Sequence, residues 1–272
     1  MKHLANKEMN IPALGFGTYK QVGEKCRKAV SIAIECGYRH LDTAQFYDNE
    51  SQVGLGIADS TTDRDALFIT TKVWRTELKA TAVRQSLENS LRDLKTEYVD
   101  LLLVHWPNDD IPLEETIEAM ATLQLEGKVR HIGGSNFTLR HLKAADKISP
   151  IVCNQVEYHP LFGQQMLLNG MAEMNLPLIA YAPLARGKVW EQPTLQEIGR
   201  RHGKTPGQVS LRWLIQQENV GGIPKATSRE HIEENFAIFD FELSPDDMKS
   251  ISSIDRGVRM ISPEWAPDWG LE

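Results

Sequence analysis

Four polar residues with complementary chemistry lie at or just after the ends of three consecutive apolar runs. Asp42 and Tyr47 follow the first run, while Lys72 and His105 stand at the ends of the next two. An ammonium group beside a phenol favours the phenolate, so Lys72 is expected to lower the pKa of Tyr47 from its reference of about 10. A tyrosine tuned in this way can donate a proton to a carbonyl oxygen that receives a hydride. The four residues predict a site for carbonyl reduction.

Each of these residues also has a structural interpretation when taken alone. Asp42 would cap a helix, Lys72 would be a surface charge, His105 would be a core histidine, and Tyr47 would only pack. The apolar neighbours of Lys72 argue for burial, and a buried lysine is rare without a partner. Asp42 supplies that partner, because paired charges can be buried at tolerable cost. His105 would then hydrogen-bond the substrate oxygen and orient it. The occurrence of all four residues together favours a catalytic site over four separate structural roles.

The elements that must position these residues are short apolar runs separated by amphipathic stretches of helical length. The stretches 84–94 and 113–125 place their leucine, isoleucine and methionine residues on one helical face. Repeated strand–helix alternation implies a parallel sheet, and eight units predict a closed (β/α)8 TIM barrel. The eight runs are 13–18, 40–44, 67–73, 99–106, 129–136, 151–158, 178–183 and 220–226.

An open, doubly wound sheet is the alternative to the barrel. Such a sheet normally carries a GxGxxG turn after its first strand, and the segment from Gly15 to Lys20 lacks the third glycine. The sequence therefore favours the barrel. In that fold the active site lies at the carboxyl ends of the strands, where the four polar residues converge.

Three local patterns refine the expected fold. The first ten residues, with Asn6 and Lys7 between short apolar stretches, predict a hairpin that closes the bottom of the barrel. The seventh connection, around residues 203–206, is expected to hold two helices. Ser244 followed by Pro245 predicts the start of a last helix, which we expect to run through Ile254. The remaining tail, which carries two tryptophans, is expected to be irregular and to lie over the barrel mouth.

Composition limits the classes of protein to consider. The length of 272 residues suits one barrel domain over 1–272, and no linker supports two smaller domains. Apolar runs far shorter than about 20 residues, and an N-terminus without an apolar segment, predict a soluble, cytoplasmic protein. Three scattered cysteines suggest reduced thiols rather than a metal site or disulfides. A net charge of −7 without a basic cluster argues against nucleic acid as a partner.

Side chains suited to a nicotinamide cofactor follow the later strands. Ser135, Asn136 and Gln155 suit a carboxamide, which needs both donors and acceptors. Tyr181 is placed to stack on a flat ring. Lys225, with a further arginine four residues on, is placed for a phosphate, since phosphate sites after strands seven and eight recur in such barrels.

Together these segments resemble the motifs of the aldo-keto reductase family, in order and over essentially the whole chain. Among bacterial members the chain looks most like the diketogluconate and methylglyoxal reductases. The motifs are LDTA with Tyr47 and Asn49-Glu50, then TKVW at 71–74, HWP at 105–107, SNF at 135–137, NQ at 154–155, YHP at 158–160, YAPL at 181–184 and IPK at 223–225.

The resemblance implies a role for each matching residue. Tyr47 would be the proton donor, Asp42 and Lys72 its supporting pair, and His105 the orienting residue. The usual cofactor is NADPH, with NADH as an alternative. The implied cofactor set is Gly17, Thr18, Asp42, Ser135, Asn136, Gln155, Tyr181, Ala182, Pro183, Leu184, Lys225, Ala226, Thr227, Arg229, His231, Glu234 and Asn235. The implied substrate pocket is Tyr19, Tyr47, Trp74, His105 and Trp106.

Three departures from the family pattern bear on the cofactor. His231 stands where the family often has arginine, and a mostly neutral imidazole holds a 2′-phosphate less firmly. Arg229 is expected to compensate. Ala226 replaces a common serine, which removes one phosphate hydrogen bond. The stretch from Leu184 to Thr194 is short compared with eukaryotic members, so the cofactor is expected to be less enclosed.

Other functions leave more of the sequence unexplained. A Schiff-base aldolase would use Lys72 as its nucleophile. In such an enzyme Ser135, Asn136, Gln155 and Tyr181 would have no function. A cofactor-binding regulatory module, as in ion-channel subunits with this architecture, would not need all four catalytic residues. A metal hydrolase would need several histidine and aspartate ligands at the strand ends. His105 is the only obvious one, so no metal is expected. The natural carbonyl substrate is left open by the sequence, and a monomer is expected from the resemblance.

Overall fold

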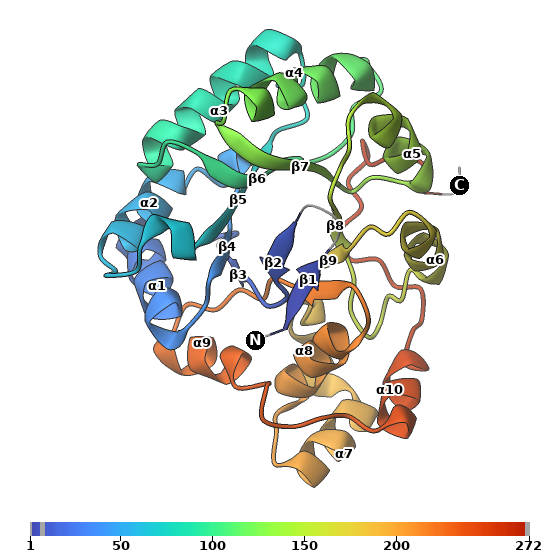
Figure 1. Cartoon of the computed structure of the whole chain (residues 1–272). Helices are drawn as coiled ribbons and strands as arrows, with labels where there is room; N and C mark the ends of the chain where they lie inside the picture. The colour runs from blue at the N-terminus through green and yellow to red at the C-terminus, as the bar shows by residue number, and fades with distance from the viewer. Residues whose placement is uncertain (1, 6–8, 270–272) are drawn as a thin grey trace.

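Eight parallel strands form the centre of the molecule in the computed structural model, which describes residues 2–5 and 9–269. Helices surround the strands on the outside (Figure 1). The strands are β3 (Phe16–Gly17), β4 (His40–Asp42), β5 (Phe68–Val73), β6 (Val99–Val104), β7 (Val129–Ser135), β8 (Asn154–Glu157), β9 (Leu178–Tyr181) and β10 (Val220–Gly222).

The sheet closes on itself between its first and last strands. Neighbouring strands pair in chain order from β3 to β10, and Leu14 forms a parallel bridge with Gly222. Across this seam Gly15 N donates to Gly222 O at 2.9 Å, and Gly17 N donates to Pro224 O at 3.0 Å. A Cβ atom on Gly17 would lie 2.8 Å from the Ile223 oxygen, so the close approach requires glycine there. The predicted barrel is confirmed, and the open sheet is excluded.

The helices lie where the apolar periodicity predicts them. Leu87, Leu91 and Leu94 are buried on one face of α3, and the helix expected at 113–125 has those bounds. The seventh connection holds two helices, α7 and α8, as predicted. The full set is α1 (Gly23–Cys36), α2 (Glu50–Ala58), α3 (Ala80–Leu94), α4 (Leu113–Leu125), α5 (Leu139–Ile148), α6 (Gln165–Glu173), α7 (Pro193–His202), α8 (Pro206–Gln216), α9 (Arg229–Phe236) and α10 (Pro245–Ser252), with short 3-10 helices η1 (Gln45–Tyr47), η2 (Arg64–Ala66) and η3 (Ala185–Glu191).

Several strands are shorter than their apolar runs. The ladder of β9 stops at Tyr181 and that of β10 at Gly222, before Pro183 and Pro224. Proline has no N–H group to donate to a neighbouring strand, so the chain leaves the sheet at these points. The residues released from the ladder line the barrel mouth, which is where the chemistry was expected.

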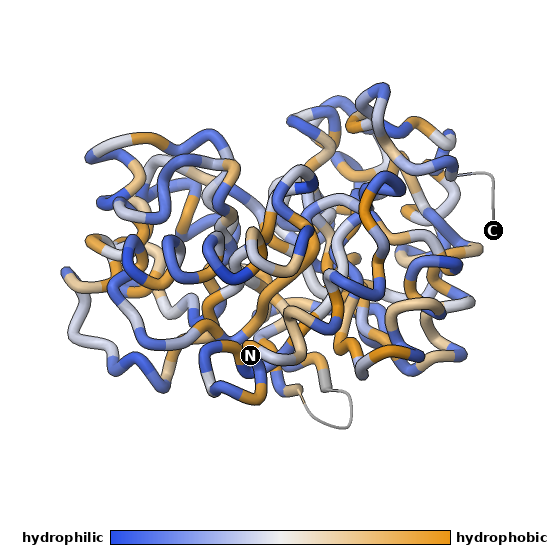
Figure 2. Tube along the Cα trace, turned by 90° about the horizontal axis from the view of Figure 1, so that it is seen from above, coloured by the Kyte–Doolittle hydropathy of each residue, from blue (hydrophilic) through white to orange (hydrophobic). Residues whose placement is uncertain are grey.

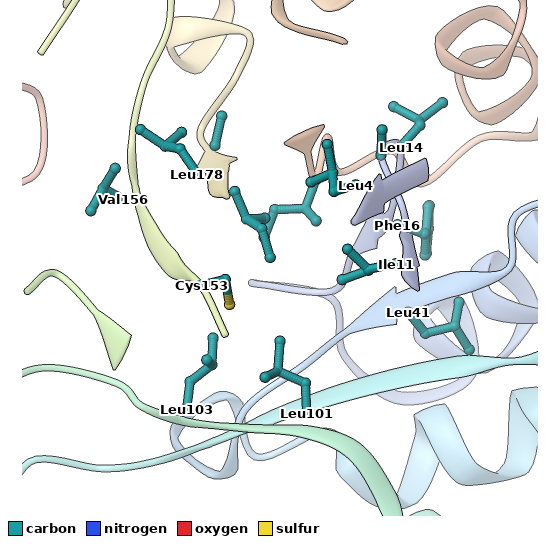
Figure 3. Close-up of a cluster of buried hydrophobic side chains, with 14 of the residues drawn as sticks. Leu4, Ile11, Leu14, Phe16, Leu41, Leu101, Leu103, Cys153, Val156 and Leu178 are labelled. Atoms are coloured by element: carbon teal, nitrogen blue, oxygen red, sulfur yellow. The ribbon is translucent and has the colours of Figure 1, made fainter. Parts of the chain in front are cut away.

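An antiparallel hairpin covers the other end of the barrel. Strands β1 (His3–Ala5) and β2 (Asn10–Pro12) pair, as predicted, while Asn6 and Lys7 lie outside the described residues. Leu4 and Ile11 are almost completely buried and project into the barrel base (Figure 3). Figure 2 shows the same hairpin from a perpendicular direction, at the lower edge of the molecule.

Apolar side chains fill the inside of the barrel. In Figure 3, Leu101 and Leu103, both on β6, point toward the interior, where Leu4, Ile11 and Cys153 also lie. The labelled residues are buried, so the interior is a packed core rather than a pore. The chemistry is therefore confined to the ends of the strands.

The last helix, α10, ends at Ser252, two residues before the expected Ile254. From Ser253 to Trp269 the chain forms no regular helix or strand, as predicted, and Met260, Ile261, Ser262, Pro263 and Trp265 line the barrel mouth. In the part of the chain that the structure describes, no helix combines the length and apolar character needed to cross a bilayer.

The start of α10 offers a stability test. Ser244 Oγ accepts a hydrogen bond from Asp247 N at 3.1 Å, and Asp247 Oδ2 accepts from Ser244 N at 3.2 Å. Ser244→Ala is expected to lower the free energy of unfolding by about 1 kcal/mol and Tm by about 2–4 °C. Calorimetry measures both. The control is Ser253→Ala, because the exposed Ser253 caps nothing at this helix start, and equal losses in both variants would contradict the capping role.

Candidate active site

The carboxyl ends of the eight strands surround a cavity of about 1320 Å³. The sheet order places residues that follow β3–β6 on one arc of its wall and residues that follow β7–β10 on the other. Pockets for a single small ligand measure roughly 300–1,000 Å³. This cavity is larger, so it has room for two ligands at once.

Lys72 and Asp42 form a buried ion pair at the floor of the cavity. Lys72 Nζ lies 2.5 Å from Asp42 Oδ1 and also donates to Thr43 O at 2.8 Å. The second carboxylate oxygen of Asp42 accepts a hydrogen bond from Gln155 Nε2 at 2.7 Å. Burial lowers the pKa of Lys72, and the carboxylate opposes that shift. Asp42 lines the cavity, whereas Lys72 lies behind it, completely buried as the sequence predicts.

Tyr47 lies between this ion pair and the open cavity. It is the last residue of η1, and its hydroxyl accepts a hydrogen bond from Lys72 Nζ at 3.4 Å. The prediction that Lys72 lowers the pKa of Tyr47 is wrong for this structure. Burial raises that pKa well above its ordinary value, and the charge of Asp42 adds to the shift. Asp42 is closer to the ammonium than the phenol is, so it neutralises much of the charge. Tyr47 therefore keeps its proton at neutral pH, as a proton donor must.

His105 follows β6 and faces the same point of the cavity. Burial lowers its pKa well below the ordinary value, and the charge of Lys72 adds to this, so the imidazole is neutral. Its ring centroid lies 5.5 Å from that of Tyr47 and 5.1 Å from that of Trp74, both nearly perpendicular. A neutral imidazole has one N–H that can donate to a carbonyl oxygen.

Aromatic rings form the wall beside these polar groups. Trp74 stacks on Phe46 with ring centroids 3.8 Å apart. Trp265, from the C-terminal tail, packs edge-on against Trp74 at 5.5 Å and against Trp106 at 5.1 Å. Tyr19 packs against Tyr47 at 5.0 Å. A carbonyl compound in this half of the cavity would meet flat apolar surfaces and a small polar floor.

The opposite arc carries the residues suited to a nicotinamide. Ser135, Asn136 and Gln155 all line the cavity. Tyr181 OH donates to Asn136 Oδ1 at 2.7 Å, while Asn136 Nδ2 donates to His105 O at 3.0 Å. These bonds hold the amide and the tyrosine ring in fixed orientations. Asn136 has a left-handed backbone, with φ of 59°, which asparagine tolerates better than most residues.

Arg229 is the exception among the expected cofactor residues. Its guanidinium pairs with Glu35 at 2.8 Å and with Glu233 at 3.3 Å, and it does not line the cavity. The expected compensation for His231 is therefore not seen. The acidic neighbours on α1 and α9 draw this side chain away. The other cavity residues of the expected set are Gly17, Thr18, Ala182, Pro183, Leu184, Lys225, Ala226, Thr227, His231, Glu234 and Asn235.

Several wall residues have no counterpart in the sequence-based site. Arg186 adds a cation from η3, and its isolated charge in a short connection gave no signal. Phe46 lies next to Tyr47, and its aromatic character was the available clue. The tail was expected to lie over the mouth, but an irregular segment has no periodicity that shows which of its residues face the cavity. The additional wall residues are Lys20, Phe46, Arg186, Gly187, Trp190, Ile223, Pro224, Ser228, Met260, Ile261, Ser262, Pro263 and Trp265.

Comparison of this chain with known proteins identifies its family. Residues 13–256 match the model of the aldo/keto reductase family. The chain is 39% identical over 267 residues to methylglyoxal reductase DkgB of Escherichia coli O157:H7, with 96% of this chain and 100% of that protein covered. It is 39% identical over 258 residues to an aldo-keto reductase of Mycolicibacterium smegmatis, covering 94% of each.

The solved structures extend this similarity to three dimensions. The crystal structure of a candidate 2,5-diketo-D-gluconic acid reductase B superposes with a TM-score of 0.96 at 43% identity, with 99% of this chain and 98% of that chain covered. A barrel with such a polar cluster and cavity defines an NAD(P)H-dependent oxidoreductase. The chain belongs to the aldo/keto reductase family.

Removal of one charge from the buried pair tests how the two ions depend on each other. Lys72→Met leaves Asp42 without its ammonium partner and is expected to lower the free energy of unfolding by about 3–5 kcal/mol. The double variant Asp42→Asn/Lys72→Met is expected to lose clearly less. Urea unfolding at pH 7 measures both. A double variant that is less stable than Lys72→Met would contradict the account.

Proposed function

We propose that this protein reduces small aldehydes, ketones or α-dicarbonyls to alcohols with NADPH, and that Tyr47 provides the proton. The observation that carries the proposal is the position of the Tyr47 hydroxyl. It lies 3.4 Å from Lys72 Nζ, beside the neutral His105, on the wall of one large cavity. The names of the related reductases make methylglyoxal and diketogluconate the first compounds to try.

The residues of the second arc fit a nicotinamide cofactor. Amide and hydroxyl groups on β7 and β8 can both donate and accept, as a carboxamide requires. Lys225, Arg186 and His231 provide positive or proton-donating groups for phosphates on the same wall. When bound, the reduced nicotinamide would supply the hydride.

The remaining chemistry is assigned to side chains of this chain. His105 donates a hydrogen bond to the carbonyl oxygen and orients the substrate. Tyr47 holds its proton until negative charge develops on that oxygen, and then transfers it. The phenolate that remains lies next to the Lys72 ammonium, which stabilises it. Asp42 keeps Lys72 charged and in place in an environment that would otherwise favour the neutral amine.

An aldolase mechanism through Lys72 fits the geometry less well. A Schiff base needs a neutral amine that can reach a substrate carbonyl. Lys72 is fully buried, is paired with Asp42, and is separated from the cavity by its neighbours. A cofactor-binding regulatory module would have no need of this arrangement of Asp42, Tyr47, Lys72 and His105.

Tyr47→Phe tests the proton donor. The variant keeps the ring but removes the transferable proton, so kcat is expected to fall at least about 10²-fold, as for loss of a general acid. Steady-state oxidation of NADPH with methylglyoxal measures this, and fluorescence titration checks that the cofactor still binds. Lys72→Met is expected to act similarly on turnover. Near-normal turnover of Tyr47→Phe would remove Tyr47 from its assigned role.

The choice between NADPH and NADH depends on the residues that face the adenosine phosphate. We propose a preference for NADPH, weakened by His231 and by the diversion of Arg229 into ion pairs. His231→Arg is expected to raise the ratio of kcat/KM for NADPH over NADH about fivefold, equivalent to about 1 kcal/mol.

Arg229→Ala is the matched control for this test. Because Arg229 does not line the cavity, its removal is expected to leave the cofactor ratio unchanged. A strong loss of NADPH preference in Arg229→Ala would show that this side chain reaches the phosphate. A clear preference of the wild-type protein for NADH would contradict the proposal itself.

A further inference from the structure

We infer that Glu157 is a positioning residue that sets substrate selectivity by anchoring the C-terminal tail over the cavity. Glu157 is the last residue of β8 and is completely buried. It does not line the cavity and has no place in the proton transfer. The inference rests on the proposed function, because it concerns which carbonyl compounds the same site accepts.

The carboxylate of Glu157 binds two consecutive main-chain amides of the tail. Oε1 accepts from Met260 N at 2.8 Å, and Oε2 accepts from Ile261 N at 2.8 Å. His159 Nε2 lies 2.9 Å from Oε1. A buried carboxylate is costly unless its oxygens are hydrogen-bonded, so these donors and the carboxylate stabilise one another. The arrangement fixes both the position and the direction of the chain at 260–261.

Weaker contacts hold the tail on either side of this point. Before it, Arg256 N and Val258 N both donate to Leu161 O at 3.3 Å. At Arg259 the guanidinium lies over the rings of Phe162, at 4.4 Å, and Trp269, at 3.7 Å. All these partners lie on the β8–α6 connection or on the tail itself. Glu157 provides the two charged bonds to the main chain of the tail, and such bonds are roughly twice as strong as neutral ones.

The anchored tail supplies part of the wall around the substrate. Met260, Ile261, Ser262 and Pro263 line the cavity directly after the Glu157 contacts. Trp265 follows and packs against the tryptophans of the barrel. A shift of the chain at 260–261 would move this tryptophan. Such a shift would weaken the binding of a bulky substrate that contacts the tail. It would not affect a small substrate that contacts only the polar floor.

Glu157→Gln tests the anchor with little change in volume. The amide oxygen can still accept one tail N–H, but the amide nitrogen is a donor and cannot accept the other. We expect KM for a bulky aromatic aldehyde to rise about fivefold, with kcat nearly unchanged, as for loss of uniform binding. Both parameters for methylglyoxal are expected to stay within about twofold.

Trypsin provides a readout that needs no activity. Arg256 and Arg259 lie in the tail, and cleavage of a folded protein follows the population of its opened segments. Mass spectrometry is expected to show cleavage at these two sites about tenfold faster in Glu157→Gln than in wild type. Ile261→Pro removes one tail N–H without altering the buried carboxylate, and is expected to reproduce the faster cleavage if Glu157→Gln folds poorly.

Asp100→Asn is the matched control. Asp100 is also a buried carboxylate on a barrel strand that accepts a main-chain bond, from Ile69 N at 2.9 Å, but it lies near the start of β6. It is expected to change neither tail cleavage nor the two KM values.

A second check combines Glu157→Gln with Trp265→Ala. The double variant is expected to show no higher KM for the aromatic aldehyde than Trp265→Ala alone, since both act through one wall.

The outcomes separate this inference from the proposed function. Unchanged cleavage and unchanged KM in Glu157→Gln would overturn the anchor, as would equal effects in Asp100→Asn. Faster tail cleavage in a protein that reduces no carbonyl compound would overturn the proposed function and the role in selectivity, while the contact between Glu157 and the tail would stand.

Discussion

The buried contact between Lys72 and Asp42 is the interaction on which the rest of the site depends. Neither charge could stay at the floor of the barrel mouth alone, because burial of a single ion is far more costly than burial of a compensated pair. The pair also fixes its surroundings: Gln155 donates to Asp42, and Tyr47 accepts from Lys72. Strands β4, β5 and β8 are thus joined by side chains at the point where the proposed reaction takes place.

Much of this architecture follows from local sequence patterns. Short apolar runs and amphipathic stretches specify a parallel barrel, because strands buried on both faces and helices buried on one face differ in periodicity. The cavity residues on the strand ends were predictable for the same reason: a barrel brings all carboxyl ends to one mouth. Ser244 and Pro245 marked a helix start that the structure contains.

Other features depend on contacts that no local pattern encodes. The pKa of Tyr47 rises because the phenol is buried and the charge of Asp42 lies near it, and these contacts exist only after folding. Arg229 is drawn to Glu35, a residue almost two hundred positions away in the chain. The path of the tail is set by Glu157, whose role could not be inferred from a segment without periodicity.

The N-terminal hairpin has a consequence for how the proposed catalyst resets itself. Leu4 and Ile11 occupy the barrel base, and packed apolar side chains fill the interior above them (Figure 3). A solvent proton that replenishes the Tyr47 hydroxyl after each turnover must therefore arrive through the same opening that admits the reactants. Reprotonation of Tyr47 and departure of the alcohol therefore use the same opening.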